Sequence, residues 1–308
     1  MTLAAGVDTA PSSSGASILR PVSLRNSISR AVARLPEPVL GKLLALRDGR
    51  SLRALGRRAV DVTRLRRLTA DDVAAFMAAE GVGGSWERDR ARIRETFADG
   101  NVGDAVNPGD RRALYHLVAG LRPRHVLELG TNIGGSTIAM AQALVSHVGD
   151  GALVTTVDIL DVNDRGAAVG AGIRQTRTPR EHLAHLGLDG MVTFVTGSSL
   201  EFMRSTDQRF DLVFVDGDHA ATAVYEDVAA ATGVLADDGV VVLHDLFPGG
   251  RQVYPSGLVI AGPYQALERI RAENDRVVVL PLGNLPWETK QGSKMTTLAI
   301  VTARDGAS

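Results

Sequence analysis

The chain has 308 residues and a formal net charge of −1 at neutral pH, so its overall charge gives no indication of nucleic-acid binding. It contains no cysteine, which excludes disulfides and thiolate metal sites and is typical of a reducing compartment. Its apolar fraction of 44% supports a sizeable core, and no apolar run approaches the roughly 18 residues that cross a membrane. We therefore expect a cytoplasmic protein with no transmembrane segment.

The N-terminal part of the chain divides by composition. Residues 1–18 hold few large apolar side chains and are predicted to be a disordered tail. Between residues 19 and 68, thirteen arginine or lysine residues stand against three acidic ones. One interpretation is that solvated basic helices pack on the main domain. The alternatives are contact with an anionic surface, either a lipid headgroup or a partner protein, and an organellar transit peptide.

Three helices are expected before the first strand. Thr69 is predicted to cap a helix that ends at Gly81, a second helix is predicted over residues 86–97, and Asp110 is predicted to cap a third. We expect residues 19–108 to form a basic, helical N-terminal extension that caps the site, and residues 109–308 to form the main domain.

Strands and helices alternate from residue 126 onward, which predicts an α/β fold: a doubly wound, Rossmann-like, seven-stranded and mostly parallel sheet with an N-terminal helical extension. The last strand is expected to be antiparallel. Strands are predicted at residues 126–129, 153–157, 192–195, 212–215, 240–243, 276–280 and 296–301. Helices are predicted at about 135–147, 180–187, 199–204, 220–234 and 262–273.

The segment from Val126 to Thr137 is the most informative local pattern. An apolar strand containing Glu128 leads into a glycine-rich turn, and Ser136 or Thr137 is predicted to cap the next helix. This layout brings a ligand close to backbone N–H groups at a helix start. A buried Glu128 would need a polar partner. Asn132 interrupts the Gly-x-Gly-x-x-Gly pattern of dinucleotide sites, so a pyrophosphate cradle is disfavoured.

Polar side chains end each of the first five predicted strands: Glu128, Asp158, Ser198, Asp216 and Asp245. In open α/β sheets the ligand lies at this edge. The Asp158 carboxylate is suited to accept both hydroxyls of a ribose. Ser198 or Ser199 is expected either to meet an adenine edge or to cap the next helix.

Three segments resemble a known family: the turn around Gly130, the run Asp216-Gly217-Asp218-His219 and the pair His244-Asp245. They are similar to class I S-adenosylmethionine (SAM) methyltransferases, in the branch related to the macrocin and rhamnosyl O-methyltransferases. The resemblance implies SAM as cofactor and leaves Mg²⁺ open as a second one. The implied cofactor-binding residues are Glu128, Gly130, Thr131, Gly134, Ser136, Asp158, Ser198 and Asp216.

The resemblance also implies roles around the reacting groups. Asp216 and Asp245 match positions that hold a divalent cation in metal-dependent relatives, although Leu246 stands where those relatives usually have an Asp or Asn. His219, Asp216 and His244 are the predicted catalytic residues, with His219 favoured as the base because imidazole titrates near neutrality. Asp216 and Asp245 would hold a metal or orient the imidazole.

The predicted activity is O-methylation of a small-molecule hydroxyl, on a sugar or a phenol. The alternatives are an NAD(P)-binding oxidoreductase, a non-catalytic SAM-binding protein and an N-methyltransferase. The family resemblance suggests a homo-oligomer. The loops 161–179 and 246–262 are expected to face the cofactor and the substrate, and Tyr254 or Trp287 to stack on a substrate ring or simply to pack.

Overall fold

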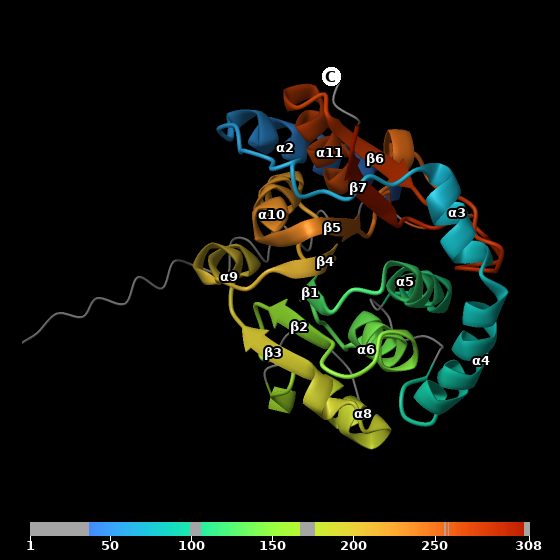
Figure 1. Ribbon diagram of the computed structural model, residues 1–308. Coiled ribbons are helices and arrows are strands. Elements are labelled where there is room, and N and C mark those ends of the chain that lie inside the picture. The colour runs from blue at the N-terminus through green and yellow to red at the C-terminus, as the bar shows by residue number, and fades with distance from the viewer. Residues whose placement is uncertain (1–36, 99–105, 167–175, 256, 258, 305–308) are drawn as a thin grey trace, which may run out of the picture.

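The computed structural model describes residues 37–98, 106–166, 176–255, 257 and 259–304 (Figure 1). The predicted tail 1–18 and residues 167–175 of the loop 161–179 lie outside the described residues. In the part of the chain that is described, no helix is both long enough and apolar enough to cross a membrane.

A seven-stranded sheet forms the centre of the molecule. Its strands are β1 His125–Leu129, β2 Leu153–Asp158, β3 Val192–Thr196, β4 Phe210–Val215, β5 Leu235–Leu243, β6 Val277–Pro281 and β7 Ala299–Ala303. Their order is β3-β2-β1-β4-β5-β7-β6. The first five strands pair in parallel, and β7 is antiparallel to both β5 and β6. The prediction of a mostly parallel sheet whose last strand is antiparallel is confirmed.

Helices cover both faces of the sheet, which is why the central strands carry apolar side chains on both of their faces. One face packs against α5 Pro108–Leu121, α6 Gly135–His147 and α8 Pro179–Leu186. The other face packs against α9 Ser199–Ser205, α10 Ala221–Val234 and α11 Gly262–Glu273 (Figure 1).

Among the described residues, three further helices precede α5 and the sheet: α2 Glu37–Ala54, α3 Ala70–Ala78 and α4 Glu80–Arg94. Thr69 caps α3 through a capping box with Asp72, as predicted. The prediction that the next helix begins near Trp86 is wrong, because α4 begins at Glu80 and runs through three glycines. Glycine costs about 1 kcal/mol in a helix interior. Burial of Trp86 and Ile93 against the core offsets that cost.

The cap of α5 also differs from the prediction. Asn107, not Asp110, accepts the hydrogen bond from the backbone N–H of Asp110. Asp110 is therefore a residue of the first helical turn, and its side chain is fully buried. The capping preference shared by Asn and Asp does not distinguish two candidates three residues apart.

The basic segment packs on the main domain over the residues described. The backbone N–H of Arg58 donates to the hydroxyl of Tyr225, and Leu65 forms a parallel bridge with Gly239. The N–H of Leu68 donates to Thr302 on β7. Helices α3 and α4 share one apolar core with the sheet. The domain boundary predicted near residue 108 therefore stays a proposal.

Candidate functional site

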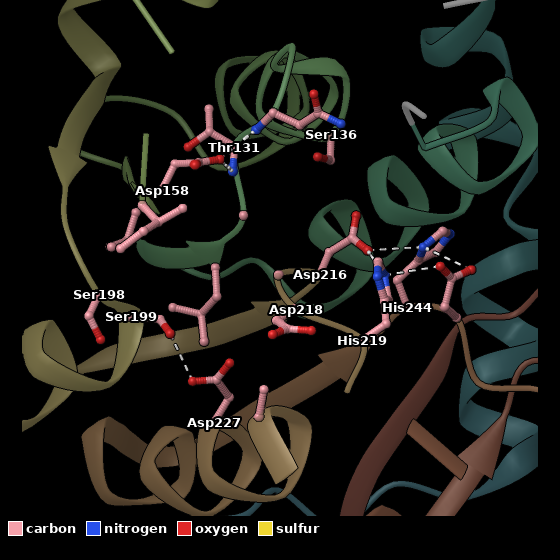
Figure 2. A pocket seen from close by; sticks show the side chains of 18 of the residues that line it. Thr131, Ser136, Asp158, Ser198, Ser199, Asp216, Asp218, His219, Asp227 and His244 are labelled. Atoms are coloured by element: carbon pink, nitrogen blue, oxygen red, sulfur yellow. Dashed lines mark hydrogen bonds and ion pairs between the residues drawn. The ribbon is translucent and has the colours of Figure 1, made fainter. Parts of the chain in front are cut away.

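A cavity of about 650 Å³ opens at the carboxyl ends of β1 to β5 (Figure 2). Four of the five predicted strand-end residues line it: Asp158, Ser198, Asp216 and Asp245. The fifth, Glu128, is fully buried behind the β1 turn. The topology therefore gathers side chains from five separate strands at one place, as expected for an open α/β sheet.

The turn after β1 forms one wall of this cavity. Gly130 has φ of +95°, and a Cβ atom there would clash with the carbonyl oxygen of Asp216. Gly134 has φ of +81° and caps α6 without a side chain. Thr131, Asn132 and Ser136 line the cavity at the start of this helix. Gly130 thus allows the β1 turn and the end of β4 to approach each other closely.

The Asp158 carboxylate is fixed by backbone donors. Its Oδ2 accepts the N–H groups of Thr131 and Asn132 at 3.0 and 2.9 Å, and its Oδ1 accepts the N–H of Leu160 at 2.9 Å. These three hydrogen bonds fix the orientation of the carboxylate. The β2 acid is therefore held in place before any ligand arrives.

The buried Glu128 carboxylate is hydrogen-bonded, as its burial requires, but to neighbouring side chains of the protein and not to a cofactor. Ser136 and Thr137 donate their hydroxyls to it at 2.5 Å each, and Thr156 donates at 2.7 Å. The prediction that Ser136 or Thr137 caps α6 is therefore wrong, because both hydroxyls turn inward to the acid. Burial raises the pKa of Glu128 to about 7, although the three hydroxyl hydrogen bonds oppose the shift.

The end of the cavity near β3 contains an acid that the sequence analysis missed. Ser198 caps α9, and Ser199 donates to Oδ1 of Asp227 at 2.8 Å (Figure 2). Asp227 lies on α10, lines the cavity and is only 6% exposed. Burial raises its pKa to about 6, and Asp218 and Glu226 add to the shift. Its only signal in the sequence is an acid on an otherwise apolar helix face.

Ile159, which follows Asp158 directly, is a second cavity residue that was not predicted from the sequence. Its side chain is 71% exposed and lines the cavity. An apolar side chain this exposed at a cavity wall offers a surface for a flat ring.

A charged cluster occupies the opposite end of the cavity. Nε2 of His219 lies 3.0 Å from Oδ2 of Asp245 and 3.5 Å from Oδ1 of Asp216. Nδ1 of His244 lies 3.1 Å from Oδ1 of Asp216, and its Nε2 lies 3.1 Å from Oδ2 of Asp110. His244 thus links the first turn of α5 to the end of β4. Asp110 was predicted only as a cap, so its place in this cluster was missed.

The electrostatics of the two histidines differ in degree. Burial opposes the charged form of His244, but the carboxylates of Asp216, Asp245 and Asp110 outweigh it and raise its pKa well above the usual value. The pKa of His219 rises to about 9 despite burial, through Asp216 and Asp245. Burial raises the pKa of Asp245, but the two histidines lower it to about 2. Both rings are therefore cationic at neutral pH while nothing else binds the carboxylates.

Asp216, His219 and Asp245 could together hold a metal ion. One ligand atom from each lies within 4.8 Å of the others. Two carboxylates and one imidazole suit a divalent transition ion, and a site with three protein ligands leaves positions open for a substrate. Mg²⁺ prefers an all-oxygen octahedral set, which His219 does not supply. Asp218 is not in this group, and its Oδ1 accepts the N–H of Ala220.

The two aromatic residues expected near the substrate, Trp287 and Tyr254, have different surroundings. Trp287 packs against His116 and lies under the guanidinium of Arg112, and its Nε1 donates to the carbonyl of Gly109. It therefore packs on α5, away from the cavity lining. Burial raises the pKa of Tyr254 to about 12, and the nearby Asp110 contributes. Its hydroxyl is buried.

Comparison with known proteins identifies the central part of the chain. Residues 127–246 match the family model described as "Methyltransferase domain". A Mycobacterium sp. (strain JLS) protein named "Putative O-methyltransferase" is 28% identical over 202 residues, which cover 63% of this chain and 82% of that protein. The matched region runs from within β1 to just beyond the end of β5 and includes the five strand-end residues.

Solved structures with a similar fold include two O-methyltransferases. TomG from Streptomyces achromogenes, in complex with SAM, is 19% identical with a TM-score of 0.48, covering 80% of this chain and 100% of its own. A Bacillus cereus O-methyltransferase in complex with SAH is 21% identical with a TM-score of 0.47, covering 77% and 98%. At these identities the likeness does not extend to a substrate.

Proposed function

We propose that this chain, a SAM-dependent methyltransferase by its fold and its domain, methylates a hydroxyl group of a small molecule such as a sugar or a phenol. The observation that carries the proposal is the cavity itself. Its two ends differ in chemistry: the β1 turn, Asp158 and Asp227 at one end suit a nucleoside, and the His219 cluster at the other suits proton removal.

The cofactor roles follow from position along the cavity. Asp158 would accept the ribose hydroxyls, and Ile159 would stack on the base. Asp227 would accept a hydrogen bond from the amino group of the adenine, and Ser198 would lie beside the adenine. Gly130, Thr131 and Ser136 would line the amino-acid end, while Glu128 and Gly134 would shape the turn from behind.

Methyl transfer is an in-line displacement in which an oxygen–carbon bond forms while the sulfur–carbon bond breaks, leaving S-adenosylhomocysteine (SAH). The acceptor hydroxyl must lose its proton, so a base must stand near the methyl group. We propose His219 as that base, because its side chain is 39% exposed at the cavity. Since its pKa is raised to about 9, it accepts a proton only in the neutral form of the ring, whose share grows as the pH rises toward 9. His244 faces a carboxylate with each nitrogen, and we propose that it positions Asp216.

A divalent ion is compatible with the same residues. Asp216, His219 and Asp245 would hold it, and it would supply a lower pKa for an acceptor hydroxyl bound beside them. His219 would then be a ligand, and the base role would pass to solvent. The donor set favours Mn²⁺ or Zn²⁺ over Mg²⁺.

Thermal unfolding with added ligands tests the cofactor assignment. A ligand present at 100 times its dissociation constant adds about 2.7 kcal/mol of stability. We expect SAM and SAH to raise the melting temperature and NAD to leave it unchanged. A response to NAD alone would favour the oxidoreductase alternative. Repeating each titration with Mn²⁺, Mg²⁺ and EDTA separates metal-assisted transfer from a base that acts alone.

An acceptor screen then separates an enzyme from a SAM-binding protein without activity. Phenolic and sugar hydroxyls, with amines as a comparison, would be incubated with SAM, and SAH formation measured. Methylation of amines only would replace the O-methyltransferase assignment with an N-methyltransferase. The cytoplasmic location and a homo-oligomer stay predictions.

A further inference from the structure

Helix α2 presents an exposed apolar stripe that the proposed methyl transfer does not use. The described residues include six large apolar side chains that are well exposed, and three of them lie on this helix. Val39 is 45% exposed, Leu43 46% and Leu46 60%. At 100° per residue they fall within an arc of roughly 60° on the helix surface.

The opposite face of α2 is firmly attached to the main domain. Leu52 and Asp48 are buried, and Leu52 belongs to the apolar core beneath α10 and α11. Arg269 of α11 donates to the carbonyls of Leu52 and Leu55, and Gln265 donates to the carbonyl of Ala45. Figure 1 places α2 at the outer edge of the molecule beside α11. The stripe therefore faces outward from a fixed helix.

Basic side chains flank the stripe on both sides. Lys42 and Arg53 lie along one border of the stripe. Arg50 falls within the arc of the stripe, and Arg47 lies beyond the other border. All four are exposed. The buried Asp48 pairs with Arg47 at 2.9 Å, so the positive charge that this face offers to a partner comes from Lys42, Arg50 and Arg53. From residue 39 to residue 54 the exposed side chains are thus basic, apolar or small, with no acid among them.

The chain that leads into α2 has the same chemistry in its sequence. Between Thr9 and Pro36 it contains Arg20, Arg25, Arg30 and Arg34 and no aspartate or glutamate. On the neighbouring helix α11, the exposed Glu268 is paired with Arg271 at 2.8 Å, so it does not offset the positive charge of α2.

We propose that α2 docks on an anionic lipid surface, with Val39, Leu43 and Leu46 entering the headgroup region and the flanking basic residues meeting lipid phosphates. An apolar stripe bordered by basic residues is the arrangement of helices that lie in the membrane interface. A second copy of this chain fits less well, because two such faces would bring like charges together. This inference is independent of the proposed methyl transfer.

Vesicle sedimentation tests the inference with the full-length chain. The vesicles are phosphatidylcholine alone, or phosphatidylcholine with 30% phosphatidylglycerol, at physiological salt. We expect sedimentation with the anionic vesicles and little with the neutral ones. Replacing Arg50 and Arg53 by glutamine should weaken binding by roughly five-fold per residue, and added salt should weaken it further.

The apolar stripe is tested by Leu43→Gln combined with Leu46→Gln, which we expect to weaken anionic vesicle binding by roughly ten-fold or more. Val145→Gln is the matched control, since Val145 is 45% exposed on α6 and should bind like the wild type. Circular dichroism and melting temperature establish that each variant is folded.

Several results would overturn the proposal. Failure of the wild type to sediment with anionic vesicles would do so, as would equal binding to both vesicle types. Unchanged binding of the Leu43→Gln/Leu46→Gln variant would show that another part of the chain makes the lipid contact, such as the arginines that precede α2 in the sequence. A dimer by light scattering that this variant disrupts, without vesicle binding, would assign the stripe to a second copy.

Discussion

Glu128 should make the stability of this protein fall as the pH rises from about 5 to 8. The carboxylate is fully buried, and burial raises its pKa from 4.5 to about 7. Between these values the folded state holds a proton that the unfolded state releases, so the free energy of unfolding decreases with pH. The stabilisation is complete below about pH 4.5 and is lost as the pH passes the folded pKa.

The magnitude follows from the shift. One pKa unit corresponds to 1.36 kcal/mol, so the raised pKa of Glu128 costs roughly 3 kcal/mol once the group is ionised in both states. Glu128→Gln keeps the shape and removes the titration. The Ser136, Thr137 and Thr156 hydroxyls can rotate to pair with the amide.

Urea unfolding at pH 5, 6.5 and 8 measures this difference. We expect the stability of the wild type relative to Glu128→Gln to decline by roughly 2.5 kcal/mol across the series, at most about 1.4 kcal/mol per pH unit. Glu201→Gln removes an exposed acid on α9 and serves as the charge control. Parallel profiles for the wild type and Glu128→Gln would refute the reasoning, because they would show that Glu128 stays ionised throughout.

Three further changes probe the site. Asp158→Asn should weaken SAH binding at least roughly ten-fold by calorimetry, since it removes the charged acceptor of a bidentate contact; unchanged affinity would remove Asp158 from the ribose site. Gly130→Ala should lower the ligand-free stability by roughly 1–3 kcal/mol, because φ is +95° and the new Cβ meets the carbonyl of Asp216; an unchanged melting temperature would contradict the crowding. Asp110→Asn should lower kcat and leave SAH affinity intact, because it loosens His244; a parallel loss of SAH binding would point to general damage.

The sheet could be predicted because its signal is local. Apolar runs bounded by turn residues mark each strand, and a parallel topology brings the residues after β1 to β5 to one edge. Asp158, Ser198, Asp216 and Asp245 were therefore found together without knowledge of any contact. The antiparallel last strand was also predicted, because the last two predicted strands lie close together in the sequence.

What the sequence did not reveal depends on contacts between distant segments. Asp110 and Asn107 both have the side chain of a helix cap, and only packing against His244 decides that Asp110 is buried. Ser136 stands near the predicted start of a helix, where a cap is expected, but it lies inside the first turn of α6 and donates its hydroxyl to the buried Glu128. Asp227 faces the cavity because α9 brings Ser199 to it. In each case a tertiary partner outweighs the local preference.

Helix α5, which directly precedes the sheet, bears on the chemistry of the site through Asp110. His219 and His244 share Asp216 and Asp245 as neighbours, but only His244 also faces a carboxylate from α5. With both nitrogens paired, His244 has no nitrogen left for a substrate and instead holds Asp216 from behind. The exposed ring of His219 keeps access to the cavity. The first turn of α5 thus decides which of two histidines can act on an acceptor, so a change there should alter turnover before it alters cofactor binding.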